Sequence, residues 1–359
     1  MNFLEDNYRG NLKWLPERTI LLTKHGSHAY GTNIPESDLD VKGVAVPPAP
    51  YFHGFLERFE QAESRAPDMV VYDVRKFFSL AADCNPNIIE VLWTDSSDHL
   101  RVTPAGERLL GARGMFLSRK AKHTFSGYAA AQLKRIRTHH RWLLHPPAAP
   151  PTRAEHGLPE NQSLISSDDR SAAEAAIEKQ VAAWDVDLEF LPKSERIALE
   201  GRIAHALAEM KITSDSRWCA AARTLGFSEN FVEGLVKERT YRTKLREWQQ
   251  FEEWKKTRNP ARAALEARWG YDTKHGMHLV RLMRMCREIL TTGRVIVKRP
   301  DKDELLAIRN GAWTYERLVV WAEKEDAELE DVAKTSPLPH GPDRKMLDTV
   351  CCEIVESMI

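Results

Sequence analysis

A short apolar segment that stops at a glycine and is followed by two closely spaced aspartates constrains this chain most. Thr19 to His25 reads TILLTKH, and its β-branched and apolar residues predict a strand that ends at Gly26-Ser27. Ten residues, His28 to Ser37, separate this turn from Asp38-Leu39-Asp40. The pattern predicts a strand, a tight turn into a helix, and a second strand that carries paired carboxylates.

The Gly26-Ser27 turn is suited to binding an anion. Glycine lets the backbone approach a phosphate closely, and the free N–H groups at a helix N-terminus favour negative charge. The Ser27 hydroxyl adds a donor, and His28 is a further candidate phosphate contact, with a capping or surface role equally open. We therefore expect Gly26, Ser27 and His28 at a nucleotide-binding site.

Asp38 and Asp40 are two residues apart where a strand over Leu39 to Val46 is predicted, so both side chains are expected on one face. Two facing carboxylates need cations, and hard oxygen ligands suit Mg²⁺, with Mn²⁺ as an alternative. Two such ions can activate an attacking hydroxyl and stabilise a pyrophosphate leaving group. Lys42 is expected on the opposite face. An ordinary turn followed by a solvated strand end is the alternative interpretation.

The rest of the first third also indicates alternating strands and helices. Met69 to Asp73 (MVVYD) predicts a third strand, which continues into a helix around Arg75 to Ala82. Asn85-Pro86-Asn87 then marks a break. We expect a small mixed α/β (α+β) domain over residues 1–112.

After about Arg113 nearly everything is predicted to be helical. Arg119 to Leu144 indicates one long helix, ended by the Pro-rich loop His145 to Pro151, with turn-rich and mobile sequence to about Ser167. Further helices are expected near 170–185, 193–212, 228–257, 260–269 and 272–292, then a strand or hairpin-like element at 294–298 and closing helices. These elements predict a larger helical domain over residues 113–359.

Charge is distributed unevenly although the total is zero, with 52 Lys and Arg against 52 Asp and Glu. Arg113 to His145 contains eight Lys or Arg, four His and no acid, which is unusual for a merely solvated helix. We expect its exposed cations to contact the phosphates of a nucleic acid or nucleotide without reading sequence, with a solvated face as the alternative. The candidates are Lys134, Arg135, Arg137, His140 and Arg141.

A second polar stripe lies on the predicted helix 272–292. Lys274, His278 and Arg281 are spaced i, i+4 and i+7, which places them on one side of a helix. A polar stripe near a helix start is usually solvated, and that interpretation stays open for these three residues. A zinc site at His275 and His278 is disfavoured, because further Cys or His partners are missing nearby.

Composition excludes several protein classes. The 359 residues suffice for one large domain or two ordinary ones, and 42% hydrophobic residues support real cores. A mean hydropathy of −0.47 and the lack of a long uncharged apolar run argue against a membrane span. The polar N-terminus argues against a secretory signal, and five cysteines without a CxxC pair are typical of reduced cytoplasmic thiols.

The Gly26-Ser27 turn with Asp38-Leu39-Asp40 resembles the signature of the DNA polymerase β nucleotidyltransferase superfamily, although His25 stands where an apolar residue is usual. The resemblance implies a palm-like fold and Mg²⁺-dependent transfer of an NMP from an NTP to a hydroxyl, with release of pyrophosphate. It also implies a third acid on a later strand. Asp73 is the best match because it ends a strand, and Asp68 is the weaker competitor. Asp38, Asp40 and Asp73 are then the expected catalytic metal ligands.

Four further blocks resemble the YcgL-like group, described as RNA-repair-pathway-associated nucleotidyltransferases. They are residues 37–44 (SDLDVKGV), 85–92 (NPNIIEVL), 271–281 (YDTKHGMHLVR) and 306–311 (LAIRNG). This resemblance implies that the acceptor is an RNA or tRNA end and that Lys274, His278 and Arg281 bind the nucleotide. Modification of a protein or small molecule is one alternative, and a non-catalytic RNA-binding module is another.

Overall fold

Five strands form one mixed sheet in the order β3-β4-β2-β1-β5. The strands are β1 (Thr19–His25), β2 (Asp40–Ala45), β3 (Gln61–Arg65), β4 (Asp68–Asp73) and β5 (His99–Val102). Only β2 and β4 pair in parallel; the other three pairings are antiparallel. The three strands expected from apolar runs are confirmed. β3 and β5 escape prediction because QAESR and HLRV are short and at least half polar.

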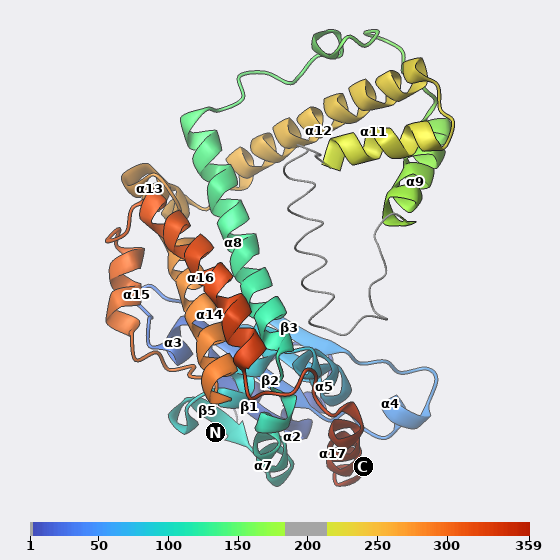
Figure 1. Cartoon of the computed structure of the whole chain (residues 1–359). Helices are drawn as coiled ribbons and strands as arrows, with labels where there is room; N and C mark the ends of the chain where they lie inside the picture. Colours follow the sequence, from blue (N-terminus) through green and yellow to red (C-terminus); the bar gives the residue numbers. More distant parts are fainter. Residues whose placement is uncertain (1–2, 184–213) are drawn as a thin grey trace. The chain divides into compact units, whose positions relative to one another are not determined.

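This computed structural model describes residues 3–183 and 214–359 and divides into two compact units. The first unit joins residues 1–144 to residues 259–359, and the second comprises residues 145–258 (Figure 1). The expected boundary after residue 112 does not coincide with these units and stays a prediction. The helix expected at 193–212 lies outside the described residues.

The two faces of the sheet differ because side chains alternate along each strand. Val41 and Ala45 of β2 and Met69 and Val71 of β4 lie in a core that α1 (Phe3–Asn7) and α2 (Leu15–Arg18) help to cover. The opposite face carries Asp40 and Lys42 at one end, and Val44 joins the main core at the other. The polar end of this face is therefore left for a site.

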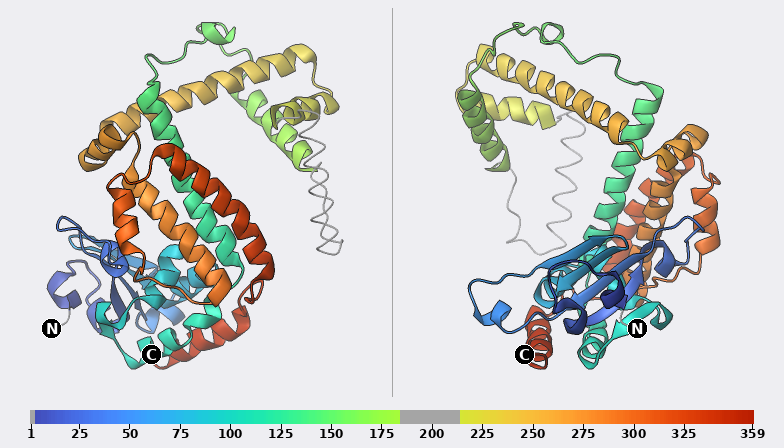
Figure 2. Two further views of the ribbon diagram at one scale, coloured as in Figure 1. Left: turned by 60° about the vertical axis from the view of Figure 1, so that its left-hand side comes forward. Right: turned by 180° about the vertical axis from the view of Figure 1, so that it is seen from behind.

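Helices on that second face form the main core of the first unit. α8 (Lys120–Leu144), α14 (Thr273–Thr292) and α16 (Tyr315–Thr335) lie side by side in all views (Figures 1 and 2). α14 is the central element, because residues on nearly every side of it are buried. α13 (Pro260–Trp269) and α15 (Lys302–Arg309) pack against its first half.

The remaining elements of the first unit are short. They are α3 (Gly26–Tyr30), α4 (Pro50–His53), α5 (Val74–Ala82), α6 (Pro86–Ile89), η1 (Glu90–Trp93), η2 (Ser96–Asp98), α7 (Pro104–Gly111), η3 (Arg113–Phe116) and α17 (Arg344–Glu356). The strand expected at 294–298 is absent from this described segment. Val295 and Val297 instead enter the main core from irregular backbone, with Ile296 exposed between them, so a β-branched run with alternating burial mimics a strand.

The second unit contains η4 (Ala154–His156), α9 (Ser167–Ala183), α11 (Ser214–Thr224) and α12 (Glu229–Thr257). Ile177, Trp218 and Leu235 form a small core between its helices. The buried carboxylate of Glu238 accepts hydrogen bonds from the Arg153 guanidinium at 2.6 and 3.2 Å. This ion pair fixes the Pro-rich connection to α12.

Long helices in this protein are amphipathic or charged. Among residues 3–183 and 214–359, no helix combines the length and apolar character needed to cross a membrane. This agrees with the expectation from mean hydropathy.

Phe77 tests how far the sheet depends on its helical cover. Its side chain on α5 is fully buried in the main core, whereas Phe55 is 84% exposed. Phe77→Ala should lower the free energy of unfolding by about 3–5 kcal/mol through lost burial and a residual cavity. Phe55→Ala should change it by less than about 0.5 kcal/mol. Urea unfolding followed by circular dichroism measures both, and equal effects would contradict the assigned core.

Candidate active site

A cleft of about 540 Å³ opens at the polar end of the sheet face within the first unit. Its floor comes from the strands, and its side comes from the Gly26-Ser27 turn. The wall opposite is formed by α8 and α14. The residues that the floor contributes are Asp40, Lys42, Asp68, Val70 and Tyr72.

Strand register brings two carboxylates together on this floor. In the parallel pairing of β2 with β4, Asp40 lies opposite Asp68. Both side chains line the cleft, with Asp40 half-buried and Asp68 exposed. Lys42 lies on the same face as Asp40, because residues two apart share a face. The expectation that Lys42 faces the other way is therefore wrong.

Asp73 does not join these carboxylates, which corrects the sequence-based choice of the third acid. It ends β4 opposite Ala45, five residues from Asp68, or about 16 Å along the strand. Its buried carboxylate caps α5 by accepting hydrogen bonds from the backbone N–H groups of Arg75 and Lys76. It also accepts from the Arg75 guanidinium at 2.9 and 3.1 Å. These contacts explain Asp73 as a structural residue.

Asp38 lies in the loop before β2 rather than on the strand. Its side chain is exposed and does not line the cleft. His28 is likewise outside the cleft lining, and its Nε2 lies 3.4 Å from the Ser37 carbonyl oxygen. His28 therefore contacts the loop that precedes Asp38, and the roles expected for both residues stay predictions.

Gly26 and Asp40 are fitted to each other. Gly26 has φ 61°, in the left-handed region that favours glycine. A Cβ atom at Gly26 would lie 1.9 Å from Asp40 Oδ2, so the carboxylate occupies the space that glycine leaves open. Ser27 lines the same cleft. The turn and the first carboxylate thus form one compact arrangement.

Cations from α14 face the carboxylates across the cleft. Lys274, His278 and Arg281 all line it, as their helical spacing predicts. Burial lowers the pKa of Lys274, and nearby Arg262 and Arg309 lower it further. Burial also lowers the pKa of His278 well below its usual value, with Arg281 and Lys274 adding to the effect. His278 is therefore neutral at pH 7 and can donate or accept a hydrogen bond.

Glu90 is the buried anion below this wall. Its carboxylate lies 2.5 Å from Arg281 Nη1, accepts a short hydrogen bond from the Tyr30 hydroxyl, and lies 3.5 Å from His25 Nε2. The Arg281 guanidinium also stacks 3.8 Å above the Tyr30 ring. Burial lowers the pKa of His25 well below its usual value, and Lys42 and Arg281 reinforce the shift. Neutral His25 thus leaves Glu90 to balance Arg281.

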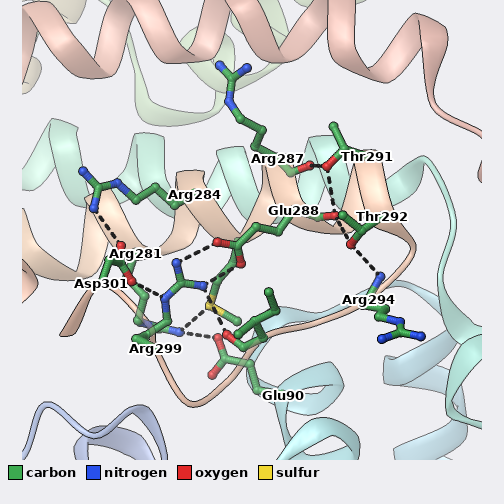
Figure 3. Close-up of polar contacts among 12 residues, drawn as sticks. Glu90, Arg281, Arg284, Arg287, Glu288, Thr291, Thr292, Arg294, Arg299 and Asp301 are labelled. Atoms are coloured by element: carbon green, nitrogen blue, oxygen red, sulfur yellow. Dashed lines mark hydrogen bonds and ion pairs between the residues drawn. The ribbon is translucent and has the colours of Figure 1, made fainter.

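A second arginine holds the end of the Gly26-Ser27 helix. The backbone N–H of Arg299 donates to the Tyr30 carbonyl oxygen at 3.0 Å. Its buried guanidinium donates to both carboxylate oxygens of Glu288 at 2.6 and 2.8 Å and to Asp301 at 2.8 Å (Figure 3). Figure 3 also shows that Arg281, which like Glu288 belongs to α14, contacts Glu90. The turn is therefore fixed from the helical side.

The carboxylate pair fits a hard divalent cation. Within the described ranges, neither the Asp40 nor the Asp68 carboxylate accepts a hydrogen bond from another residue. Burial raises the pKa of Asp40, and the neighbouring charge of Asp68 raises it further. A cation between the two oxygens would relieve that repulsion. No group of three Asp, Glu, His or Cys side chains suited to a metal is found in the described part of the chain.

The acid-free helix α8 finds its counter-charges elsewhere in the first unit. Arg137 pairs with Glu323 and Lys122 with Glu330, both of α16. His140 stacks on Tyr315 at 3.7 Å between ring centroids. Among the expected RNA contacts, Lys134, Arg135, Arg137 and Arg141 are exposed, and His140 is partly buried. The partnership with α16 therefore explains part of the basic sequence by packing alone.

The N-terminal part of the chain matches a known protein family. Residues 9–145 match the family described as RlaP, the RNA repair pathway DNA polymerase beta family. The expected resemblance to the RNA-repair group of the DNA polymerase β superfamily is thereby confirmed for this segment, which contains the turn, Asp40 and Asp68. The family suggests a polymerase β-like nucleotidyltransferase in an RNA repair pathway.

One curated relative is a protein of Enterobacteria phage T4, described as an uncharacterized 38.9 kDa protein in the nrdC-mobD intergenic region. It is 33% identical over 87 residues, which make up 21% of this chain and 26% of the phage protein. The match therefore spans about a quarter of that relative. No solved structure matches the chain significantly.

Sequence reasoning misassigned two residues of the cleft, Asp68 and Lys42, and missed Glu90 below its wall. Asp68 is the weaker candidate by sequence because it precedes the apolar run, although the residue at the start of a strand can also face the site. The position of Lys42 on the cleft face follows from strict alternation along the strand, because Lys42 is two residues after Asp40. Glu90 lies within the block 85–92, and a lone glutamate in an apolar stretch (IIEVL) is a signal for a buried charge.

Two glycines allow the fit between Gly26 and Asp40 to be measured. Gly26→Ala and Gly31→Ala both place alanine at positive φ, 61° and 72°, but a Cβ at Gly31 meets only Lys302 Cδ at 3.7 Å. Gly31→Ala should cost about 1 kcal/mol of stability, and Gly26→Ala about 1–3 kcal/mol more. In an Asp40→Ala background most of this excess should disappear, because only the Cβ of residue 40, 3.2 Å from the added atom, remains in contact. Urea unfolding of the six proteins tests this, and an unchanged excess at Gly26 would contradict the contact.

The buried histidines predict a pH dependence of stability. The folded pKa values of His25 and His278 lie below the unfolded value of about 6.5, so each contributes stability above that pH and loses it as pH falls. Between pH 6 and 5, each should cost about 1 kcal/mol of unfolding free energy. His25→Asn should therefore flatten the pH profile relative to the wild type.

The raised pKa of Asp40 acts in the opposite direction, so the difference between the two profiles is the quantity to compare. The His25 ring resonance in the wild-type protein provides an independent check by NMR. A ring that titrates between pH 7 and 5.5, or parallel stability profiles, would contradict a neutral His25.

Proposed function

We propose that this protein is a Mg²⁺-dependent nucleotidyltransferase that transfers an NMP from an NTP to a hydroxyl acceptor. The observation that carries the proposal is the pairing of Asp40 with Asp68 beside the Gly26-Ser27 turn. A site for two-metal chemistry needs carboxylates next to a phosphate-binding turn, and both lie in one cleft. The family match over the same residues supports the assignment.

Asp40 and Asp68 would hold the cations, and Asp38 is the expected third ligand from the adjacent loop. Bound Mg²⁺ would supply charge neutralisation for the phosphates and the leaving group. Asp38 is exposed at a loop position two residues before Asp40. Mn²⁺ satisfies the same oxygen ligands.

The chain's own residues account for binding the donor. The Gly26-Ser27 turn offers backbone N–H groups and a hydroxyl, and Lys274 and neutral His278 offer donors from the opposite wall. Arg281 is held by Glu90, so it contributes a fixed positive charge instead of a mobile one. The triphosphate would lie between the turn and α14.

The reaction is written as an in-line displacement. The acceptor oxygen attacks the α-phosphorus, the α–β phosphoanhydride bond breaks, and pyrophosphate leaves with the bonding electrons. Asp68 is the more exposed of the two carboxylates on the floor, and we propose that it accepts the acceptor's proton. Val70, Tyr72 and Tyr128 continue the lining beyond it and offer apolar and aromatic surface for the acceptor.

The acceptor is proposed to be an RNA or tRNA end. The description of the matching family, an RNA repair pathway, supports this choice. Lys134 and Arg141 on α8 supply exposed positive charge for a phosphate backbone. Transfer of label from NTP to protein or a small molecule would favour the alternative acceptors, and salt-sensitive RNA binding without turnover would favour a binding module.

Asparagine substitutions at two aspartates of β4 separate catalysis from structure. Asp68→Asn should lower Mg²⁺-dependent release of pyrophosphate by about a thousandfold, because a metal ligand stabilises the transition state by several kcal/mol. Asp40→Asn should act alike. Asp73→Asn should cost about 1–2 kcal/mol of stability through the weakened cap and ion pair while activity at low temperature stays within about tenfold.

Total cellular RNA, each labelled NTP in turn and Mg²⁺ provide the assay, with circular dichroism as the folding control. Full activity in Asp68→Asn together with its loss in folded Asp73→Asn would reverse the assignment of the third carboxylate. Full activity in both Asp40→Asn and Asp68→Asn would refute the proposed reaction.

A further inference from the structure

Positive charge collects at the start of α14, beyond the lining of the cleft. Arg135 of α8 and Arg262 of α13 both direct a guanidinium at His275 Nε2, at 3.4 and 2.6 Å. Lys274 precedes His275 on α14. Arg309 ends α15 beside them, since its carbonyl oxygen accepts a hydrogen bond from the Thr273 hydroxyl at 2.6 Å. Four helices thus contribute one cation each.

Few anions balance this cluster of Arg135, Arg262, Lys274 and Arg309. Asp272 is buried and pairs with Arg262 at 2.9 Å. Glu36, on the loop before Asp38, is the other acid whose charge acts on Arg309. Two positive charges therefore remain in excess among these described groups. His275 adds none, because burial lowers its pKa, and the flanking arginines oppose its protonation.

Two of the four cations have no direct partner. In the described ranges, neither Lys274 nor Arg309 makes a side-chain hydrogen bond or ion pair, although both are only partly exposed. Burial lowers the pKa of Arg309, and Arg262 lowers it further. Half-buried cations that repel one another destabilise a fold unless an anion joins them. The arrangement therefore indicates a ligand with several negative charges close together.

The cluster is continuous with the carboxylate cleft. Lys274 belongs to both, and its pKa responds to Asp40 as well as to Arg309. On α8, Gln132 lines the cleft, and Arg135 follows it by three residues on the same side of the helix. A molecule bound at Asp40 can thus extend from the cleft to the cluster.

We propose that Arg135, Arg262, Lys274 and Arg309 form a subsite for the terminal phosphates of the nucleoside triphosphate and for the pyrophosphate that leaves. This rests on the proposed nucleotidyl transfer. A pyrophosphate group concentrates its charge within a few ångströms, which suits a compact cluster. A phosphodiester backbone spreads one charge per nucleotide and fits the exposed cations farther along α8 better. The subsite would make the enzyme prefer triphosphate donors.

Arg309→Ala and Arg135→Ala test the subsite without disturbing the cleft. Neither side chain holds the fold through an ion pair to an acid in the described structure, so both variants should fold. Isothermal titration with Mg²⁺-free inorganic pyrophosphate and tripolyphosphate should show affinity about tenfold weaker for each. Lys324→Ala is the charge-matched control, because Lys324 is 75% exposed on α16; its affinity should equal that of the wild type.

Binding of a single-stranded RNA oligomer tests the alternative that the cluster binds the acceptor strand. The affinity for this oligomer should stay within about twofold in Arg309→Ala. Pyrophosphate affinities equal to wild type in both arginine variants would overturn the subsite. A loss of RNA affinity larger than the loss of pyrophosphate affinity would also overturn it and assign the cluster to the acceptor strand.

Asp68→Asn separates this inference from the proposed reaction. It should abolish transfer and leave arginine-dependent pyrophosphate binding intact. If the wild-type protein binds pyrophosphate through these arginines but transfers no nucleotide, the proposed reaction and its nucleotide donor are refuted. A pyrophosphate site would remain. If the protein transfers nucleotides and its arginine variants bind pyrophosphate normally, only the proposed subsite is refuted.

Discussion

The buried carboxylate of Glu90 is the interaction on which the site depends. A carboxylate that is 1% exposed is tolerated only when its charge and lone pairs are satisfied. Arg281 supplies the charge, and Tyr30 and Arg281 supply the hydrogen bonds. Tyr30 ends the helix that begins at Gly26, and Arg281 belongs to α14. One anion therefore ties the turn on the sheet side to the wall on the helical side.

This arrangement also explains why the cleft keeps its electrostatic asymmetry. The floor carries the two acids and the wall carries the cations, yet Lys42 on the floor donates to the Asn87 carbonyl oxygen at 3.1 Å, away from both aspartates. Arg281 forms its ion pair with Glu90, so it does not form one with Asp40. The carboxylates remain available to a cation from solution, and Lys274 and His278 remain available to phosphate.

The local sequence pattern predicts the Gly26 turn and Asp40, but it does not identify the carboxylate that lies opposite Asp40. The Gly26 turn and Asp40 follow from an apolar run, a glycine and a two-residue period, all of which are local. The choice between Asp68 and Asp73 depends on the register of β2 against β4, a parallel pairing across more than twenty residues of intervening chain. Both aspartates flank the same apolar run. Only the pairing shows that Asp68 is opposite Asp40 and that Asp73 is free to cap α5.

The same limit applies to charge. The sequence shows that α8 lacks acids, but it does not show that Glu323 and Glu330 of α16 lie against it, nearly two hundred residues later. Conversely, Arg262, Lys274 and Arg309 look unremarkable in sequence, because each has an acid within a few positions. Folding directs two of those acids elsewhere, Glu266 to His139 and Glu304 to Arg284, whereas Asp272 stays in the cluster and pairs with Arg262. The cations left in excess are therefore a tertiary property, and they lie where Lys274 meets the carboxylate cleft.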